Sequence, residues 1–219
     1  MPKTYNETIN GVKYFASAEK ALKEQVYRLF ELVGRIPRGT VRDGFRVEMG
    51  FSVFTFSQRR GGSQILAPDS DGDPFRETTE DLTRALLILL SQTNILKRYR
   101  LDGAPCRFDD KLILTKGALE QPLISLERSG AAYEGDSGWF IQGLRREEDG
   151  SLTPVAPAGF EGAEELPAEA YGSMYAWQLL DKRPAAAELL LLPRGCFAAL
   201  DGEEILEILN DKDERLLGG

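Results

Sequence analysis

The side chains of this chain that could do chemistry are carboxylates, hydroxyls, amines, guanidiniums and two thiols, because none of its 219 residues is histidine. The lack of an imidazole excludes a Ser-His-Asp or Cys-His arrangement and a histidine-ligated zinc site. It also removes the commonest general base, although carboxylate, lysine and tyrosine chemistry stays open. The composition therefore favours a binding protein over an enzyme, and we expect no catalytic residue.

Ser137 stands in the sequence Gly-Asp-Ser-Gly at residues 135–138, which resembles the serine context of trypsin-like proteases. No histidine is present to activate this serine, and the Gly-x-Ser-x-Gly pattern of lipases fails because residue 139 is Trp. The same residues are typical of a tight turn, in which Asp and Ser side chains bind local backbone and Gly138 supplies an unusual backbone conformation. We expect a turn that leads into a strand.

Two further segments have a motif-like composition. Residues 69–73, Asp-Ser-Asp-Gly-Asp, with Glu80 beyond them, have a calcium-loop spacing, but the sharp-turn position is Pro74 instead of glycine. We expect a solvated acidic loop there. Residues 59–62, Arg-Arg-Gly-Gly, lack the Lys-Ser/Thr and the helix that follow a phosphate-binding loop, so we expect a hairpin tip.

Cysteine usage and hydropathy predict the compartment. Cys106 and Cys196 are too few for a disulfide framework, and neither lies in a metal-binding pattern. The first residues show no basic start followed by an apolar run, so we expect no secretory signal. The longest apolar runs, at residues 85–90 and 189–192, fall far short of the roughly 20 residues that span a bilayer. We expect a soluble cytoplasmic protein with reduced thiols, no metal, no cofactor and no membrane partner.

Charge is divided unevenly along the chain. Residues 1–125 carry 19 Lys and Arg against 16 Asp and Glu, whereas residues 126–219 carry 8 against 19, a net charge of −11. An acidic half of this size repels nucleic acid and attracts basic protein surfaces over about a Debye length. The alternative is that the acidity serves solubility alone.

Hydrophobic periodicity predicts the elements of the first half. Residues 17–33 and 78–97 are expected to form the two main helices, each with one apolar face. Strands are expected at 45–49, 51–56, 64–67, 111–115 and 122–126, with a hairpin around the glycines at 61 and 62.

The second half is expected to contain a strand at 139–142, an exposed loop over 147–170, a helix at 173–180 and strands at 189–192 and 196–200. Residues 203–210 fit a strand or a short helix. The pattern predicts an α+β fold in which antiparallel sheets pack with two main helices. We expect two subdomains, residues 1–128 and 129–219.

Part of the second half resembles a known family. The residues concerned are GDSGWFIQG at 135–143, the acidic stretch that follows, Tyr-Ala-Trp-Gln-Leu-Leu at 175–180, and Pro184 with the leucine run that ends in Pro-Arg-Gly-Cys-Phe at 193–197. In this order they resemble the immunity protein 33 family, a small bacterial domain of uncertain function. The resemblance covers residues 130–202, a third of the chain.

The resemblance implies a cytoplasmic antitoxin that neutralises a protein toxin, and a basic toxin would suit the acidic half. Trp139 fits either core packing or an interface anchor. Two alternatives stay open: an interaction module without a toxin partner, and a small-molecule-binding protein or enzyme that uses carboxylates in a pocket. The candidate partner-binding residues are Asp136, Ser137, Trp139, Glu147, Glu148, Asp149, Glu164 and Glu165.

Overall fold

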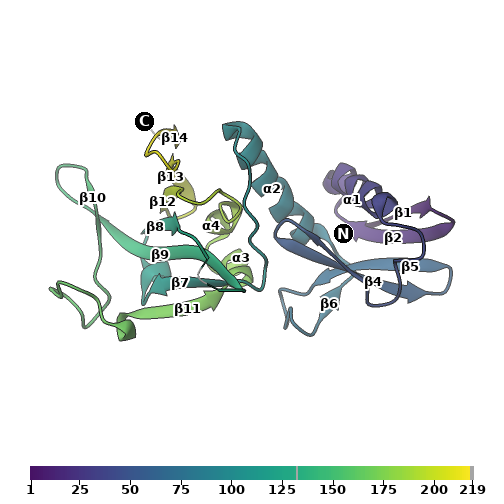
Figure 1. Cartoon of the computed structure of the whole chain (residues 1–219), viewed down its shortest axis with the longest axis horizontal. Helices are drawn as coiled ribbons and strands as arrows, with labels where there is room; N and C mark the ends of the chain where they lie inside the picture. The colour runs from purple at the N-terminus through teal and green to yellow at the C-terminus, as the bar shows by residue number, and fades with distance from the viewer. Residues whose placement is uncertain (132, 218–219) are drawn as a thin grey trace. The chain divides into compact units, whose positions relative to one another are not determined.

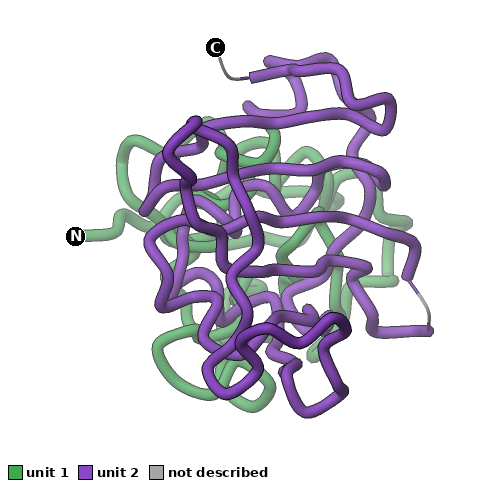
Figure 2. The backbone as a smooth tube through the Cα atoms, turned by 90° about the vertical axis from the view of Figure 1, so that its left-hand side faces the viewer, with its two compact units in different colours: residues 1–93 green, residues 94–219 purple. Residues whose placement is uncertain are grey.

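The computed structural model describes residues 1–131 and 133–217. The chain divides into two compact units, Met1–Thr93 and Asn94–Gly219, called unit 1 and unit 2 below and coloured separately in Figure 2. Each unit is built on its own mixed sheet (Figure 1), so the α+β class predicted from the sequence is confirmed. No helix in the described part of the chain is both long enough and apolar enough to cross a membrane.

Unit 1 contains a six-stranded sheet in the order β1-β2-β5-β4-β3, with β6 paired to β5. Neighbouring strands are antiparallel except β2 and β5, which are parallel. The strands are β1 (Lys3–Ile9), β2 (Val12–Ala18), β3 (Arg46–Met49), β4 (Ser52–Arg59), β5 (Gly62–Pro68) and β6 (Thr78–Thr79). The expected hairpin tip at residues 59–62 is confirmed, since Arg59 pairs with Gly62 across a two-residue turn.

The hairpin of β1 and β2 was not among the predicted elements. Its loop is Asn10-Gly11, and both residues have positive φ angles, 53° and 81°. A two-residue loop with this backbone matches the twist of the strands that it joins, and Asn-Gly is the pair that adopts it most readily. This hairpin places Ser17 in a strand, with its hydroxyl 2.9 Å from that of Thr4.

The first main helix, α1 (Lys23–Arg35), therefore begins later than the predicted residue 17, after a short 3-10 turn, η1 (Lys20–Leu22). Its predicted apolar face is confirmed, because four side chains on it are at most 3% exposed: Val26, Leu29, Phe30 and Val33.

The second main helix, α2 (Thr83–Tyr99), also begins later than predicted. Thr78 and Thr79 pair with β5 as strand β6, and Asp81 then starts the helix. Its carboxylate accepts hydrogen bonds from the Thr83 N–H at 3.0 Å and the Thr83 hydroxyl at 2.5 Å. The division between the two units falls within α2.

Unit 2 contains an eight-stranded sheet in the order β11-β7-β9-β8-β12-β13-β14, with β10 paired to β9. Only β7 and β9 are parallel. The strands are β7 (Lys111–Thr115), β8 (Leu123–Arg128), β9 (Asp136–Arg146), β10 (Leu152–Pro154), β11 (Tyr171–Tyr175), β12 (Phe197–Asp201), β13 (Glu204–Leu209) and β14 (Arg215–Leu217). Short helical segments join them: η2 (Ala118–Glu120), η3 (Ala168–Ala170), η4 (Ala176–Gln178), α3 (Leu179–Lys182) and α4 (Pro184–Glu188).

Unit 2 differs from the sequence prediction at three places. The expected boundary after residue 128 is replaced by one between Thr93 and Asn94, because β7 and β8 pair with β9 in one sheet. The expected helix at 173–180 starts as strand β11, which pairs with β7, and becomes helical only from residue 176. The expected strand at 189–192 is a buried turn after α4.

Arg128, the last residue of β8, explains why the run at 189–192 is not a strand. Its side chain is 3% exposed and donates hydrogen bonds only to backbone carbonyl oxygens. Nη1 donates to Ala104 (3.1 Å), Leu190 (3.0 Å) and Leu192 (2.5 Å), Nη2 to Pro105 (2.5 Å) and Nε to Ser137 (3.3 Å). The carbonyls of the leucine run therefore bind a guanidinium instead of a neighbouring strand.

The charge of Arg128 is solvated by these dipoles and not by a carboxylate. Burial lowers the pKa of its guanidinium, since removal from water disfavours the charged form. Burial of a charge without hydrogen bonds costs on the order of several kcal/mol of desolvation free energy. Hydrogen bonds from the guanidinium to the carbonyl oxygens offset this cost. The planar five-donor fork of arginine suits such a ring of acceptors.

Arg183 plays a similar role on the other side of the helical segment. It is 7% exposed, and its guanidinium donates to the carbonyl oxygens of Gly202 (3.0 Å), Pro122 (3.4 Å) and Gln121. Together the two arginines attach the segment that contains α3, α4 and the leucine run to the loops at the ends of β8, β9 and β12.

We expect Arg128→Met to lower the free energy of unfolding of unit 2 by at least about 3 kcal/mol, because each buried carbonyl left without a donor costs about 1–3 kcal/mol. Both tryptophans of the chain, Trp139 and Trp177, lie in unit 2, so urea unfolding followed by tryptophan fluorescence reports on that unit alone.

The matched control is Arg145→Met. Arg145 is an exposed arginine of the same sheet, paired with Glu147 at 2.8 Å, and such a pair contributes at most about 1 kcal/mol. Equal losses for Arg128→Met and Arg145→Met would contradict the role given to Arg128.

Candidate functional site

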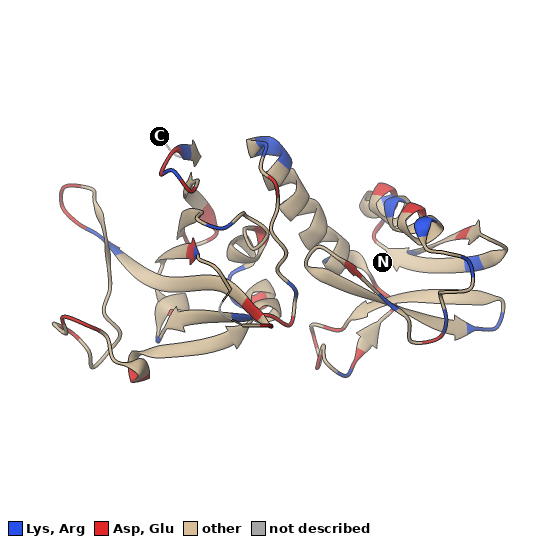
Figure 3. Cartoon of the chain, viewed as in Figure 1, with Lys and Arg blue, Asp and Glu red and all other residues tan. Residues whose placement is uncertain are grey.

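The register of the unit 2 sheet collects one set of loops at one end. Strands β7, β9 and β12 finish at this end, and their antiparallel neighbours β11, β10, β8 and β13 start there. The loops concerned are residues 116–122, 145–151, 155–170 and 201–204, called the acidic end below. They carry eleven Asp and Glu against three Lys and Arg. Figure 3 shows acidic residues along the β9–β10 hairpin and along the loop that precedes β11.

The carboxylates of the β9–β10 hairpin are held by local hydrogen bonds. Glu147 accepts from the Thr153 hydroxyl at 2.5 Å and from the Arg145 guanidinium at 2.8 and 3.0 Å. Asp149 accepts from the Ser151 hydroxyl at 2.6 Å and the Ser151 N–H at 2.9 Å. These bonds lower the pKa of both carboxyls, the Thr153 bond most for Glu147 and the Ser151 hydroxyl most for Asp149. Both groups are therefore ionised at neutral pH.

The loop before β11 carries carboxylates that point into solvent. Glu161 is tied to its own turn by two 3.1 Å hydrogen bonds from the Gly159 N–H. Backbone N–H groups, its own first and that of Gly159 next, lower the pKa of its carboxyl. Glu164 and Glu165 are exposed. This loop therefore presents full negative charge on an open surface.

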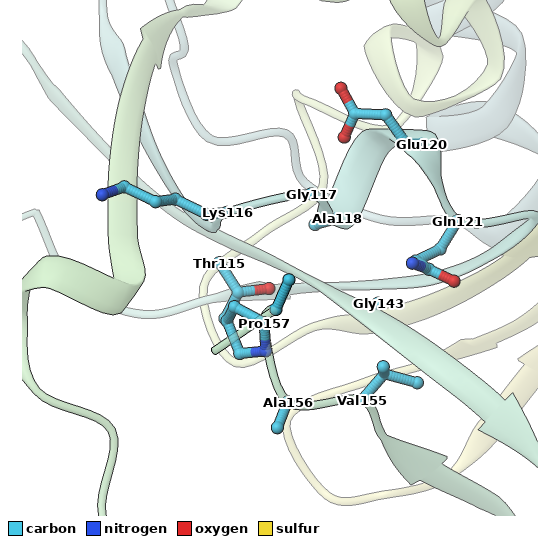
Figure 4. A pocket seen from close by; sticks show the side chains of 11 residues that line it. Thr115, Lys116, Gly117, Ala118, Glu120, Gln121, Gly143, Val155, Ala156 and Pro157 are labelled. Carbon is cyan, nitrogen blue, oxygen red and sulfur yellow. The ribbon is translucent and has the colours of Figure 1, made fainter. Parts of the chain in front are cut away.

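A groove of about 380 Å³ opens at the acidic end (Figure 4). Its polar side chains are Thr115, Lys116, Glu120 and Gln121, and its other walls come from 117–118, Gly143 and 155–158. Gly143 makes room for Gln121, because a Cβ there would lie 2.7 Å from the Gln121 Cγ.

The groove is lined by one buried polar side chain, Thr115, which is 2% exposed. The Lys116 ammonium points away from Gln121 and Val155 in Figure 4, so it does not fill the groove. A hydroxyl and an amide among small apolar walls can bind a side chain directionally, and the carboxylates around them set its charge.

The Asp-Ser-Gly-Trp segment lies at the opposite end of the sheet, where β9 begins. Trp139 and Ser137 are 1% and 4% exposed. The Ser137 hydroxyl donates to the Lys111 carbonyl at 2.7 Å and accepts from the Trp139 N–H at 3.1 Å. The Trp139 indole donates to the Leu190 carbonyl at 3.0 Å and lies 5.5 Å from the Arg128 guanidinium. These two side chains are part of the core, so the prediction that they contact a partner is wrong.

The expected turn at this segment is confirmed by the bond from the Gly138 N–H to the Asp136 carboxylate, 2.9 Å long. Asp136 is half-buried and serves this turn, away from the acidic end. Five of the eight candidate residues do lie together at the acidic end: Glu147, Glu148, Asp149, Glu164 and Glu165.

Sequence reasoning missed the other half of this site. Six more carboxylates join the acidic end through loop closure: Glu120, Glu161, Glu169, Asp201, Glu203 and Glu204. The Asp-Gly pair at 201–202, between two apolar strands, is a hairpin signal that could have brought three of them to the same edge.

Comparison of the chain with protein-family models, curated proteins and solved structures gave no match. The immunity protein 33 resemblance therefore stays a prediction that rests on the residues quoted for it.

Metal and thiol chemistry can be assessed from the described residues. No group of three or more Cys, Asp or Glu side chains among them is arranged to hold a metal ion. Cys106 and Cys196 are both fully buried. Burial raises the pKa of Cys106 to about 12 and also raises that of Cys196. Both thiols are therefore protonated and inaccessible at neutral pH.

We expect Gly138→Ala to destabilise unit 2 more than Gly150→Ala, by about 1–3 kcal/mol of overpacking. Both glycines have positive φ angles, 75° and 86°. A Cβ on Gly138 would lie 2.5 Å from the Ser129 carbonyl oxygen, whereas one on Gly150 meets nothing within 4 Å. Urea unfolding followed by tryptophan fluorescence gives the free energy of unfolding of both variants. Equal losses of stability would mean that the turn at Gly138 has room for a side chain.

We expect neither thiol of the native protein to react with Ellman's reagent at pH 8, and both to react in urea, because a raised pKa keeps the thiolate population low. Ser173→Cys, on the exposed surface of β11, provides a fast-reacting control. A native thiol that reacted at the rate of this control would show that the core around Arg128 opens readily.

Proposed function

We propose that this chain is a non-catalytic binding protein that holds a basic segment of a partner protein at the acidic end of unit 2. The observation that carries the proposal is the charge of the loops collected there, eleven carboxylates against three cations. The carboxylates come from four separate stretches of chain, and the sheet register brings them to one edge.

The rest of unit 2 strengthens this field. The unit carries 14 Lys and Arg against 23 Asp and Glu, a net charge of −9. Two of its 14 cations, Arg128 and Arg183, are buried, so neither can make a direct contact with a partner. A surface with one sign of charge raises the association rate of an oppositely charged protein and disfavours partners of like charge.

The groove supplies specificity that charge alone does not give. A lysine or arginine stem can pack against the small apolar walls while its charged head stays among the carboxylates, because such side chains are amphipathic. The Thr115 hydroxyl and the Gln121 amide then offer directional hydrogen bonds. In protein interfaces, a few side chains that fill well-packed, desolvated pockets contribute most of the binding free energy.

The resemblance to the immunity protein 33 family suggests the kind of partner. A cytoplasmic antitoxin that covers a basic toxin, such as a nuclease, needs a fixed acidic surface and no catalytic group. The acidic end supports this reading through its charge, and the absence of histidine agrees with it.

The test compares two triple variants with the same net charge. The first variant neutralises three exposed carboxylates of the acidic end: Glu148→Gln, Glu164→Gln and Glu165→Gln. The second variant neutralises three exposed carboxylates elsewhere in unit 2: Glu127→Gln, Glu134→Gln and Asp213→Asn. Each immobilised protein is incubated with lysate of the source cells, and the retained partner is identified, purified and titrated by calorimetry. We expect a basic polypeptide that binds wild type and the second variant equally and the first at least tenfold more weakly, with salt weakening all three.

An equal loss of affinity in the two variants would show that net charge, and not the acidic end, determines binding. That result would overturn the proposal. The antitoxin hypothesis is tested separately, by expressing the gene of the identified partner in cells with and without this chain. It requires that the partner alone stops growth and that co-expression of this chain restores it. A harmless partner that binds at the acidic end would keep the binding function and reject the antitoxin reading.

A further inference from the structure

Unit 1 contains a cleft formed by its own residues alone. It has a volume of about 210 Å³ and lies between the tip of the β1–β2 hairpin and the loop that follows α1. Its apolar walls are Val12, Val33, Ile36, Pro37 and Val41. Its polar groups come from Asn10, Tyr14 and Arg38.

Tyr14 is the buried polar group of this cleft. Its side chain is 5% exposed, and its ring contacts Phe56 edge-to-face with centroids 5.9 Å apart. Burial raises the pKa of this phenol, so the hydroxyl keeps its proton and can act as a donor. The Asn10 amide is a second possible donor, held at the hairpin tip by the positive φ angle of that residue, 53°.

One cation, Arg38, lines the cleft. Arg35 and Arg42 are its neighbours in sequence, and residues 32–42 contain no Asp or Glu. Within the described part of the chain, none of these three guanidiniums forms an ion pair. Asp43, the next residue along, accepts the Gln58 N–H at 2.8 Å.

Two nearby features carry the opposite sign. The carboxyl end of α1 has a partial charge of about −0.5, which the full positive charge of Arg38 outweighs. Glu7 pairs with Tyr14 across the hairpin, but it does not line the cleft. The balance at the rim therefore favours an anion, whereas the walls favour hydrocarbon.

We propose that this cleft binds a small carboxylate with a short apolar tail. The carboxylate lies against the Arg38 guanidinium and the Tyr14 hydroxyl, and the tail packs against Val33, Ile36 and Val41. The volume corresponds to about seven water-sized groups, which suits a ligand of that many heavy atoms. The same chemistry occurs in a free short-chain acid and in the carboxyl terminus of a peptide that ends in an apolar residue.

The test is a titration of the ¹⁵N-labelled full chain, followed by the shifts of its backbone amide signals. The probes are hexanoate, its neutral counterpart hexanamide, and acetyl-Gly-Val with either a free carboxylate or a carboxamide end. We expect hexanoate to shift the amides of Gly11, Val12 and Gly39 in a saturable way, and hexanamide to bind at least tenfold more weakly.

The variants separate a built site from general attraction. Arg38→Gln should weaken hexanoate at least tenfold and leave hexanamide unchanged, and Tyr14→Phe should weaken hexanoate with the fold intact. Arg28→Gln removes the same charge from α1 at a residue outside the cleft, and it should change affinity less than threefold. Tenfold tighter binding of the peptide carboxylate than of hexanoate would assign the site to a chain terminus, and the reverse to a free acid.

Equal shifts with hexanoate and hexanamide would overturn the proposal, as would shifts scattered over unit 1. Equal loss in Arg38→Gln and Arg28→Gln would also overturn it, because the attraction would then be one of net charge. Neither result bears on the acidic end, whose residues all belong to unit 2.

Discussion

The packing of unit 2 depends on one buried guanidinium. Arg128 ends a central strand, and its guanidinium donates to five carbonyl oxygens, from the segment after α2 (104–105), from β9 (137) and from the leucine run (190 and 192). No other single side chain of the described residues joins so many separate stretches of backbone in this structure. Its head is charged and its acceptors are neutral, so the interaction is a solvation shell built from peptide dipoles. The Asp-Ser-Gly-Trp turn belongs to this shell, since it supplies the Ser137 carbonyl and places the Trp139 ring near the guanidinium.

The same arrangement affects the surface. Burial of Arg128 and Arg183 leaves two guanidiniums of unit 2 without contact to solvent, while the carboxylates of the acidic end lie in exposed loops. Because strands β7, β9 and β12 share one direction, the loops that follow them meet at one edge of the sheet. These loops contain few Lys or Arg side chains to balance their carboxylates. Of the two arginines, Arg183 lies at the acidic end, where its guanidinium is buried against the Gly202 and Gln121 carbonyls and so is not available to pair with a carboxylate of a loop there.

Much of the fold could be predicted from local patterns. Periodicity and turn chemistry predict the apolar face of α1, the hairpin at 59–62 and strand β7. The sequence Asn10-Gly11 is also typical of a hairpin, so the pairing of β1 with β2 was predictable in the same way. The leucine run at 189–192 could not be predicted, because its carbonyls bind an arginine about 62 residues away in sequence. Likewise, five carboxylates of the acidic end were identified as candidates, but their proximity to Asp201 and Glu204 depends on pairing of β8 with β12. Composition indicates that a surface is acidic, whereas strand register determines where the charges meet.

The account of unit 2 is tested most directly by hydrogen exchange of the arginine side chains, observed by ¹⁵N NMR. If Arg128 is enclosed by five carbonyl oxygens, its Nε–H and Nη–H signals will be resolved from one another and will exchange with water far more slowly than those of the exposed Arg145. Exchange of the Arg128 side chain at the rate of Arg145 would contradict the account, because a guanidinium that water reaches freely cannot hold the leucine run and the Asp-Ser-Gly-Trp turn to the sheet.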